Sequence, residues 1–312
     1  MKNFILGHYR KLFKSDETKF IIFVGLKVTF ISAFVNLSVY YFLFQIMRLN
    51  LAFFKAHGFP EFYEGTPFFD YIVQESLDQI PVFAAFHIFL FFIGVYLGWL
   101  ILRPFRMIGA YCEEVLGNPN TIYKIDEFST YRLLTRFSEF FFEYLRESRL
   151  KGTMTSNSIP PQFSKIHQPV SDKIFMLHFG ILLVIIAISS CLFVTENAES
   201  VYRNMLELAG STLKDKTAVN KFFADQMFIL DEIIRLVIFG ITIGYTMLGF
   251  HLYNKVAGSA FGIFSTMRAF MKGNHFSRVH LLGFSYIRDY TRKLNKYLDY
   301  MENNFSNNKS KD

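Results

Sequence analysis

The chain has 312 residues, of which 52% are hydrophobic and only 19% are charged, and its formal net charge is +7. Its 40 phenylalanines and 17 tyrosines far exceed the aromatic content of soluble proteins, so the composition argues against an ordinary soluble domain. The basic residues form no compact basic domain, which argues against nucleic-acid binding, and Cys112 and Cys191 are too few for a disulfide framework.

Four long apolar runs follow one another along the chain. They cover residues 20–47, 82–102, 174–194 and about 236–252. Because a helix needs about 17–25 apolar residues to cross the hydrocarbon of a bilayer, the runs predict four transmembrane helices in an all-α, polytopic membrane protein. The first run follows a polar and basic segment and is too long for a signal peptide, so we expect it to remain as an anchor.

Lys27 is the one charged residue well inside the first run. A charge within the membrane is a functional candidate by default. It lies about eight residues into the run, or about 12 Å at 1.5 Å per residue. We therefore expect its long side chain to reach the lipid headgroups.

His87 lies in the second run, where a hydrogen bond between helices is the expected role.

The charges outside the runs predict the topology. Basic and acidic residues number 5 and 2 in residues 1–19, 2 and 5 in 48–81, 10 and 8 in 103–173, 5 and 7 in 196–235, and 10 and 4 in 255–312. Basic segments are retained on the cytoplasmic side of membranes. The pattern predicts a multi-pass membrane protein, in contact with lipid, with both termini and the central segment 103–173 in the cytoplasm.

An internal repeat relates the two halves of the chain. The first and third apolar runs begin 154 residues apart, and so do the second and fourth. Gly117 and Gly273, each followed by Asn, are 156 residues apart, and the sequences EYL (143–145) and KYL (296–298) are 153 residues apart. The repeat predicts two tandem transmembrane hairpins, each followed by a cytoplasmic helix–loop–helix.

The predicted organisation has seven segments. They are a cytoplasmic N-terminus (1–19), a first hairpin (20–102), a first helix pair (103–150), a linker rich in Ser and Pro (151–173), a second hairpin (174–254), a second helix pair (255–303) and a disordered tail (304–312).

Apolar residues recur in steps of three and four along each cytoplasmic helix, which is typical of helices that pack against one another. The residues that we expect at these helix-packing or switch positions are Phe105, Ile108, Val115, Phe137, Phe141, Met267, Ile287, Tyr290, Leu294, Tyr297 and Met301. The alternative is that the helices rest on the membrane surface with their basic side chains outward.

These helix pairs resemble HAMP domains, the signal-relay linkers of bacterial chemoreceptors and sensor kinases. Pro104 stands at the membrane exit, Gly117 follows 13 residues later, and Tyr123 and Val279 each come six residues after the loop glycine. We expect Pro104, Gly117 and Gly273 to mark loop turns. The resemblance implies two degenerate copies of a module that forms parallel four-helix bundles in homodimers and switches between packing states. It also implies that the protein lies in the inner membrane of a bacterial cell.

No catalytic pattern is present in the sequence. The histidines have no partners at the spacing of metal ligands, and no phosphate-binding or nucleophile motif occurs. We therefore expect no catalytic residues, no metal and no cofactor, and the protein is not expected to be an enzyme.

The combined pattern favours a signal-relay or adaptor protein that transmits conformational change through its tandem units to a separate partner protein, as a homodimer. The alternative is a structural subunit or scaffold of a larger membrane complex, without switching. A transporter is a third hypothesis, although the apolar runs contain few polar residues.

Overall fold

The computed structural model describes residues 15–56, 74, 77–124, 132–166, 173–212 and 216–306. These residues form helices, turns and connecting segments and contain no strand, so the all-α fold class is confirmed at this level. Among the residues outside this description are 1–14, 57–73, 75–76 and 307–312.

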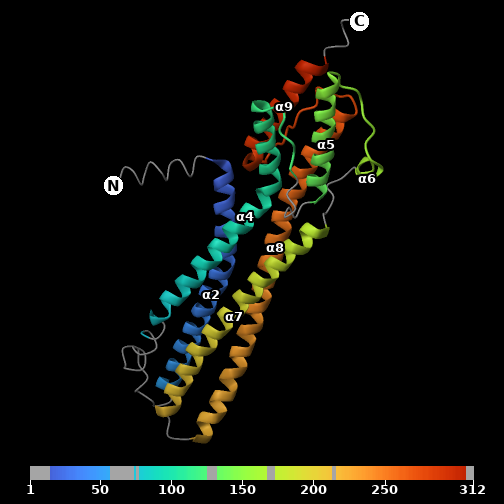
Figure 1. The fold of residues 1–312 in the computed structure, drawn as a ribbon. Helices are drawn as coiled ribbons and strands as arrows, with labels where there is room; N and C mark the ends of the chain where they lie inside the picture. Colours follow the sequence, from blue (N-terminus) through green and yellow to red (C-terminus); the bar gives the residue numbers. More distant parts are fainter. Residues whose placement is uncertain are drawn as a thin grey trace, which may run out of the picture. The chain divides into compact units, whose positions relative to one another are not determined.

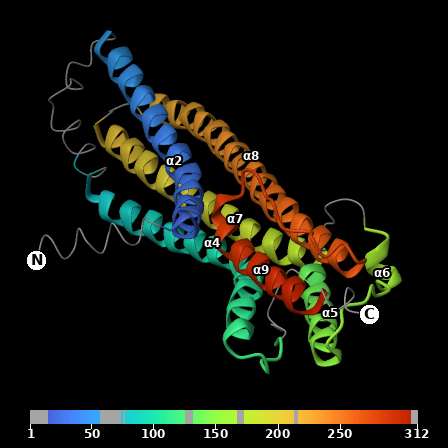
Figure 2. The same cartoon turned by 90° about the horizontal axis from the view of Figure 1, so that it is seen from above.

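The long α-helices of the described residues are coloured along the chain in Figures 1 and 2. They are α2 (Asp16–Ala56), α4 (Ile80–Gly117), α5 (Arg132–Lys151), α7 (Lys173–Thr212), α8 (Lys216–Met271) and α9 (Arg288–Met301). The short elements are α6 (Pro161–Ser164), a 3-10 turn η1 (Ser285–Ile287) and a π-helical turn η2 (Glu302–Ser306). Because η2 continues α9, helical structure extends past residue 304, where the tail was expected to begin.

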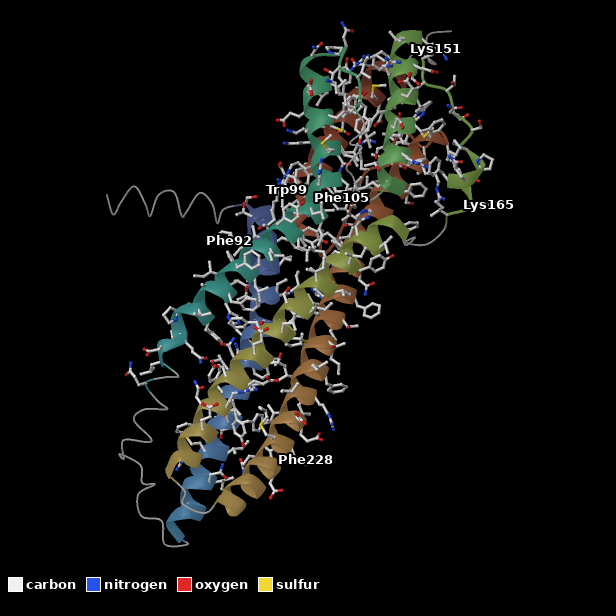
Figure 3. All side chains as sticks on the ribbon, turned by 60° about the horizontal axis from the view of Figure 1, so that its bottom comes forward. Phe92, Trp99, Phe105, Lys151, Lys165 and Phe228 are labelled. Atoms are coloured by element: carbon white, nitrogen blue, oxygen red, sulfur yellow. The ribbon has the colours of Figure 1, made fainter. Side chains whose placement is uncertain are left out.

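Four of these helices are long and apolar enough to cross a membrane. The candidate spans are Asp16–Asn50, Ile80–Gly117, Leu177–Asn204 and Asp225–Met271. Between 22% and 28% of their most apolar windows is buried inside the protein. Large apolar side chains lie on the outside instead, among them Phe92 and Phe228, which are 62% and 63% exposed (Figure 3). Helices that are apolar all round suit a lipid environment, and a multi-pass membrane protein agrees with these spans.

Two helices run further than the apolar pattern predicts. α8 has 56 residues and unites residues 216–235, which precede the fourth apolar run, with that run and with the first helix of the second pair. No proline interrupts residues 216–271, so nothing in this range breaks the hydrogen-bond ladder. α7 likewise continues from the third apolar run to Thr212.

Pro104 lies inside α4, which corrects the prediction that it marks a loop turn. Proline has no backbone N–H and its ring displaces the preceding turn, so a proline inside a helix produces a bend rather than an end. Figure 3 shows α4 changing direction near Phe105, the next residue. The apolar run and the first helix of the pair are therefore one continuous helix.

The chain divides into two compact units. Unit 1 comprises residues 1–24, 95–181 and 249–312, and unit 2 comprises residues 25–94 and 182–248. α2, α4, α7 and α8 each contribute one part to each unit. Unit 1 contains α5, α6 and α9, and unit 2 consists of parts of the four long helices.

Close helix contacts and a few buried polar groups define the core of unit 2. A Cβ atom on Gly94 of α4 would lie 2.7 Å from the Cα of Gly25 in α2, so the two helices approach each other closely where neither has a side chain. The Tyr245 hydroxyl of α8 donates to the Val28 carbonyl of α2 at 3.0 Å. These contacts hold parts of unit 2 that are distant in sequence.

The predicted linker is ordered over residues 152–166 and packs on the helices of unit 1. Tyr144 of α5 donates to the Thr155 carbonyl at 2.8 Å, and the Asn157 amide donates to the Met271 carbonyl at 3.0 Å. The ring of Phe163 lies 5.1 Å from that of Phe137. The linker therefore fastens the end of α5 to the end of α8.

Candidate functional site

Four helical segments of unit 1 pack around a core of aromatic side chains. They are residues 105–117 of α4, α5, residues 256–271 of α8, and α9, and we refer to them as the unit 1 bundle. Each half of the predicted sequence repeat would supply two of the four segments.

α4 and α9 run in the same direction. Gly109 of α4 lies against Tyr290 of α9, and one turn further along both helices Glu113 pairs with Lys293 at 2.7 Å. Because residue numbers rise together along both helices, α4 and α9 are parallel. This face of the bundle joins the first helix of the first copy to the second helix of the second copy.

α5 and α8 form the corresponding parallel pair. The ring of Phe137 lies 4.5 Å from that of Phe264, and further along both helices Phe141 lies 6.2 Å from Phe270. Between these contacts the Ser138 hydroxyl lies 4.0 Å from the Met267 sulfur. Here the second helix of the first copy meets the first helix of the second copy.

An aromatic cluster joins the two pairs. Tyr111 of α4 lies 4.5 Å from Phe142 of α5 and 6.3 Å from Tyr297 of α9, measured between ring centroids. At the end of α5, Arg149 donates to the Pro119 carbonyl just beyond α4. α4 and α5 therefore also run in the same direction, and all four segments are parallel.

The expected helix-packing residues all lie in buried positions of unit 1. Phe105, Ile108, Val115, Phe137, Phe141, Met267, Ile287, Tyr290, Leu294, Tyr297 and Met301 are each 0–6% exposed. Their role in switching stays a prediction. Sequence reasoning left out Phe142 and Phe270, which are equally buried and complete the aromatic core.

Tyr297 occupies the centre of the bundle with its hydroxyl group unsatisfied. The side chain is fully buried, and its hydroxyl has no hydrogen-bond partner among the described residues. Burial raises the pKa of Tyr297 far above its usual value, so the phenol stays neutral. A buried polar group without a partner costs about 1–3 kcal/mol, so this packing is strained at its centre.

Arg106 connects α4 to the beginning of α2. Its guanidinium pairs with Glu17, and its Nε lies 3.5 Å from the Tyr290 hydroxyl. Burial raises the pKa of Tyr290 to about 12. These contacts bring the start of the first apolar helix into the polar edge of the bundle.

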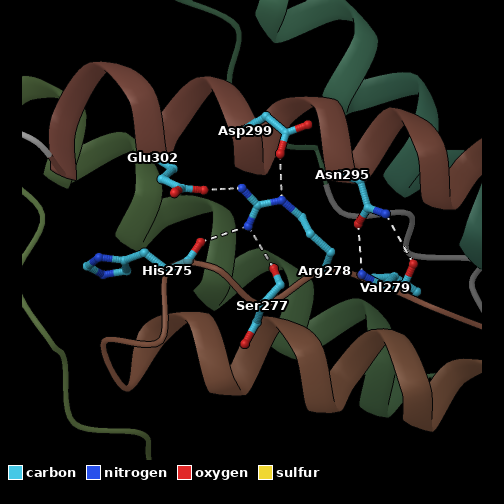
Figure 4. A network of polar contacts seen from close by, with 7 residues as sticks. All are labelled: His275, Ser277, Arg278, Val279, Asn295, Asp299 and Glu302. Atoms are coloured by element: carbon cyan, nitrogen blue, oxygen red, sulfur yellow. Dashed lines mark hydrogen bonds and ion pairs between the residues drawn. The ribbon is translucent and has the colours of Figure 1, made fainter.

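Residues 272–284 join α8 to η1 and α9, and we refer to them as the second connector; residues 118–131, between α4 and α5, are the first connector. Arg278 fastens the second connector to α9 (Figure 4). Its guanidinium bonds Asp299 at 2.6 Å and also Glu302, and it donates to the backbone carbonyls of His275 and Ser277. The Arg278 side chain is only 14% exposed. Charged hydrogen bonds of this kind are stronger than neutral ones, so they hold residues 275–278 against the helix.

Asn295 completes this attachment one turn earlier on α9. Its Oδ1 accepts from the Val279 amide at 2.8 Å, and its Nδ2 donates to the Val279 carbonyl at 3.1 Å (Figure 4). Val279, an expected apolar connector residue, is 4% exposed. Sequence reasoning identified Val279 but missed Arg278 and Asn295, because their partners lie 16–24 residues away.

The loop glycines differ in conformation. Gly273 follows α8 with a φ of 97°, and the Asn274 amide donates to the Ala269 carbonyl, which is the usual way to end a helix at a glycine. Gly117 is the last residue of α4, and no atom lies within 4 Å of a Cβ placed there. Tyr123 of the first connector packs at 4.9 Å from Phe142.

Two further predictions concern Lys27 and metal binding. Lys27 lies on an exposed face of α2, together with Phe23 and Phe30, which agrees with a side chain that extends toward headgroups. Within the described ranges, no group of three or more His, Cys, Asp or Glu residues is arranged to hold a metal ion. The predicted lack of metal, cofactor and catalysis stays untested.

Comparisons with protein-family models, curated proteins and solved structures find no match for this chain. The resemblance to HAMP domains therefore stays a prediction, and the unit 1 bundle is interpreted from its own geometry.

Proposed function

We propose that the protein is a signal-relay or adaptor protein in which one chain supplies both halves of a HAMP-like bundle. The observation that carries this proposal is the parallel packing of α4 against α9 and of α5 against α8. A HAMP homodimer places two copies of a helix pair in such an arrangement. Here the two copies would come from the tandem repeat.

Continuity of the helices supports a relay. α4 and α8 each run without interruption from unit 2 into the unit 1 bundle. A rotation or shift of either helix within the membrane would therefore be transmitted to side chains in the bundle. Two nearly balanced packings need a bias of only a few kcal/mol to exchange.

Tyr297 supports the idea that this packing is one of two states. An unsatisfied hydroxyl at the centre of the core disfavours the present packing by about 1–3 kcal/mol. A second packing that hydrates or bonds this hydroxyl would then be close in free energy. Tyr297 is thus the residue that we expect to set the balance.

The topology in this proposal follows from the charge pattern, and the bacterial membrane follows from the HAMP resemblance. The bundle would lie on the cytoplasmic side of a bacterial inner membrane with both termini, and the apolar helices would contact lipid. A separate partner protein would read the state of the bundle. The homodimer stays a prediction. The helix-packing positions that suggested it are buried by contacts within one chain.

Distance measurements between spin labels test the relay. Labels at Glu139 and Arg292, both exposed on α5 and α9, report the separation of two bundle helices in bilayer nanodiscs. We expect two distance populations, and Tyr297→Phe should increase the share of one. Labels at Arg288 and Lys296, both exposed on α9, form the control pair and should give a single distance in every sample.

The structural-subunit alternative predicts a different outcome from the same experiment. A rigid scaffold would give one distance population between α5 and α9, unchanged by Tyr297→Phe. That result would reject the relay and leave a docking role for the bundle.

A further inference from the structure

Three buried side chains of unit 2 carry polar atoms that have no hydrogen-bond partner among the described residues. Ser32 and Asn36 of α2 are 0% and 1% exposed, and His87 of α4 is 7% exposed. The Ser32 hydroxyl, both amide atoms of Asn36 and the Nε2 of His87 have no hydrogen-bond partner among the described residues. Unmet polar groups are costly in water-free surroundings, and more so within a bilayer.

The register of α2 and α4 places Ser32 opposite His87. Gly25 lies against Gly94, and 15 residues along both helices, in opposite directions, Tyr40 donates to Gln79 at 2.9 Å. Ser32 is seven residues after Gly25, and His87 is seven residues before Gly94. Seven residues are about two helical turns, so both side chains lie at the same depth and on the facing sides of the two helices.

Asn36 extends the same surface by one turn of α2. It follows Ser32 by four residues, a rise of about 6 Å on the same side of the helix. At the same depth as Asn36, α4 carries Phe83, whose ring lies 4.1 Å from the His87 ring. Phe193 of α7 lies 6.1 Å from His87. Aromatic side chains therefore border the polar group.

The usual helix partner of Ser32 is already occupied. A buried serine in a helix commonly donates to the carbonyl four residues earlier, which here is Val28. The Val28 carbonyl accepts instead from the Tyr245 hydroxyl, which also lies 3.3 Å from Ser190. Tyr245 thus ties α2 to α8 and occupies the carbonyl that the Ser32 hydroxyl would otherwise bond.

The chemistry of His87 indicates which partner these side chains need. Its Nδ1 lies 2.8 Å from the Phe83 carbonyl, which only accepts hydrogen bonds, so Nδ1 is the donor of this contact. When the ring carries a proton on Nδ1 alone, Nε2 presents a lone pair that accepts a hydrogen bond. Asn36 presents two N–H donors and an oxygen acceptor, and Ser32 presents one hydroxyl that does both.

We propose that Ser32, Asn36 and His87 form a buried water-binding site between α2 and α4. Water is the small ligand that donates to His87 Nε2 while it accepts from the Asn36 amide or the Ser32 hydroxyl. We favour water over a cation, because the three side chains include no carboxylate or thiolate and the Asn36 amide carries N–H donors, which a cation cannot use. Buried waters typically make about three hydrogen bonds, which these side chains supply.

X-ray radiolytic footprinting of the full chain in nanodiscs tests the site. The pulse converts water to hydroxyl radicals, which oxidise the side chains that contact that water. After correction for intrinsic reactivity, we expect His87 to be oxidised well above Leu90, which is 0% exposed and lies one turn away on α4. Oxidation of His87 at the level of Leu90 would overturn the proposal.

A pair of variants localises the water. Ser32→Ala combined with Asn36→Leu should reduce oxidation of His87 to the level of Leu90, because two of the three groups that hold the water are removed. Ser38→Ala is the matched control, since Ser38 donates to the Phe34 carbonyl of its own helix and should leave oxidation unchanged. Oxidation of His87 that persists in a folded double variant would also overturn the site.

Discussion

Gly109 of α4 lies directly against Tyr290 of α9. A Cβ atom placed on Gly109 would be 2.8 Å from Cδ1, 3.1 Å from Cα and 3.2 Å from Cβ of Tyr290. The closest approach of the two helices therefore depends on the absence of a side chain at position 109. Because one helix comes from each copy of the repeat, this contact holds the two halves of the bundle together.

A side chain at position 109 should separate α4 from α9. We expect Gly109→Leu to lower the free energy of unfolding of the bundle by about 1–3 kcal/mol, as overpacked cores do. Gly117→Leu is the matched control, because no atom lies within 4 Å of a Cβ there, and it should leave stability unchanged or raise it slightly. Chemical unfolding in detergent, followed by circular dichroism, measures both. Equal effects of the two variants would contradict the contact.

Tyr297 and Tyr144, which are 153 residues apart and equivalent in the repeat, should respond in opposite ways to loss of the hydroxyl. Tyr297→Phe removes a buried group without a partner and should stabilise the bundle by about 1–2 kcal/mol. Tyr144→Phe removes the donor to the Thr155 carbonyl at 2.8 Å and should destabilise it by about 1 kcal/mol. Destabilisation by both variants would show that the Tyr297 hydroxyl has a partner.

Arg278 should control the order of the second connector. Arg278→Ala removes two ion pairs and two backbone contacts, so we expect a loss of about 1.5–3 kcal/mol and faster hydrogen exchange at the Val279 amide. Arg278→Lys retains the charge but not the planar fork and should recover only part of the protection. Arg288→Ala, at an exposed position of α9, is the control. Unchanged exchange at Val279 in Arg278→Ala would contradict this role.

Tyr290 predicts loss of stability in alkaline solution. Its pKa is about 12 in the folded protein and about 10 in an unfolded chain, so the unfolded tyrosine releases its proton first. Unfolding then releases a proton, and stability falls as the pH rises from about 10 to about 12. Tyr290→Phe should reduce the slope of unfolding free energy against pH in this range. An unchanged slope would show that the Tyr290 phenol is not shielded from water.

The sequence contained the periodic features of the fold but not its long-range contacts. Apolar runs identified the four candidate spans, and steps of three and four identified buried positions such as Phe137 and Leu294. These signals are local, because a helix turns every 3.6 residues and shows one side to the core. The prediction for Pro104 was wrong, because a proline often begins a helix but this one lies within α4 and bends it.

The partners of the buried residues had no comparable signal. The spacing that makes Tyr290 suitable for helix packing is the same whether its partner belongs to a second chain or to Gly109 of its own chain. The predicted repeat offered a hypothesis on this point, because two copies in one chain would supply all four helices of a bundle. The attachment of Arg278 to Glu302 and of Asn295 to Val279 depends on how the connector folds back, which periodicity does not describe.

A designed disulfide distinguishes contact within one chain from contact between chains. The Cβ separation of 3.2 Å between positions 109 and 290 is close to the 3.5–4.5 Å of natural disulfides. In a Cys112→Ala, Cys191→Ala background, Gly109→Cys with Tyr290→Cys should therefore oxidise within the chain. After proteolysis at a site engineered in the linker, the two fragments should stay joined until reduced. Gly109→Cys with Arg292→Cys is the control, because Arg292 is exposed on α9, and it should give separate fragments. A product of twice the mass from the first pair would instead place the partner helix in a second copy of the protein.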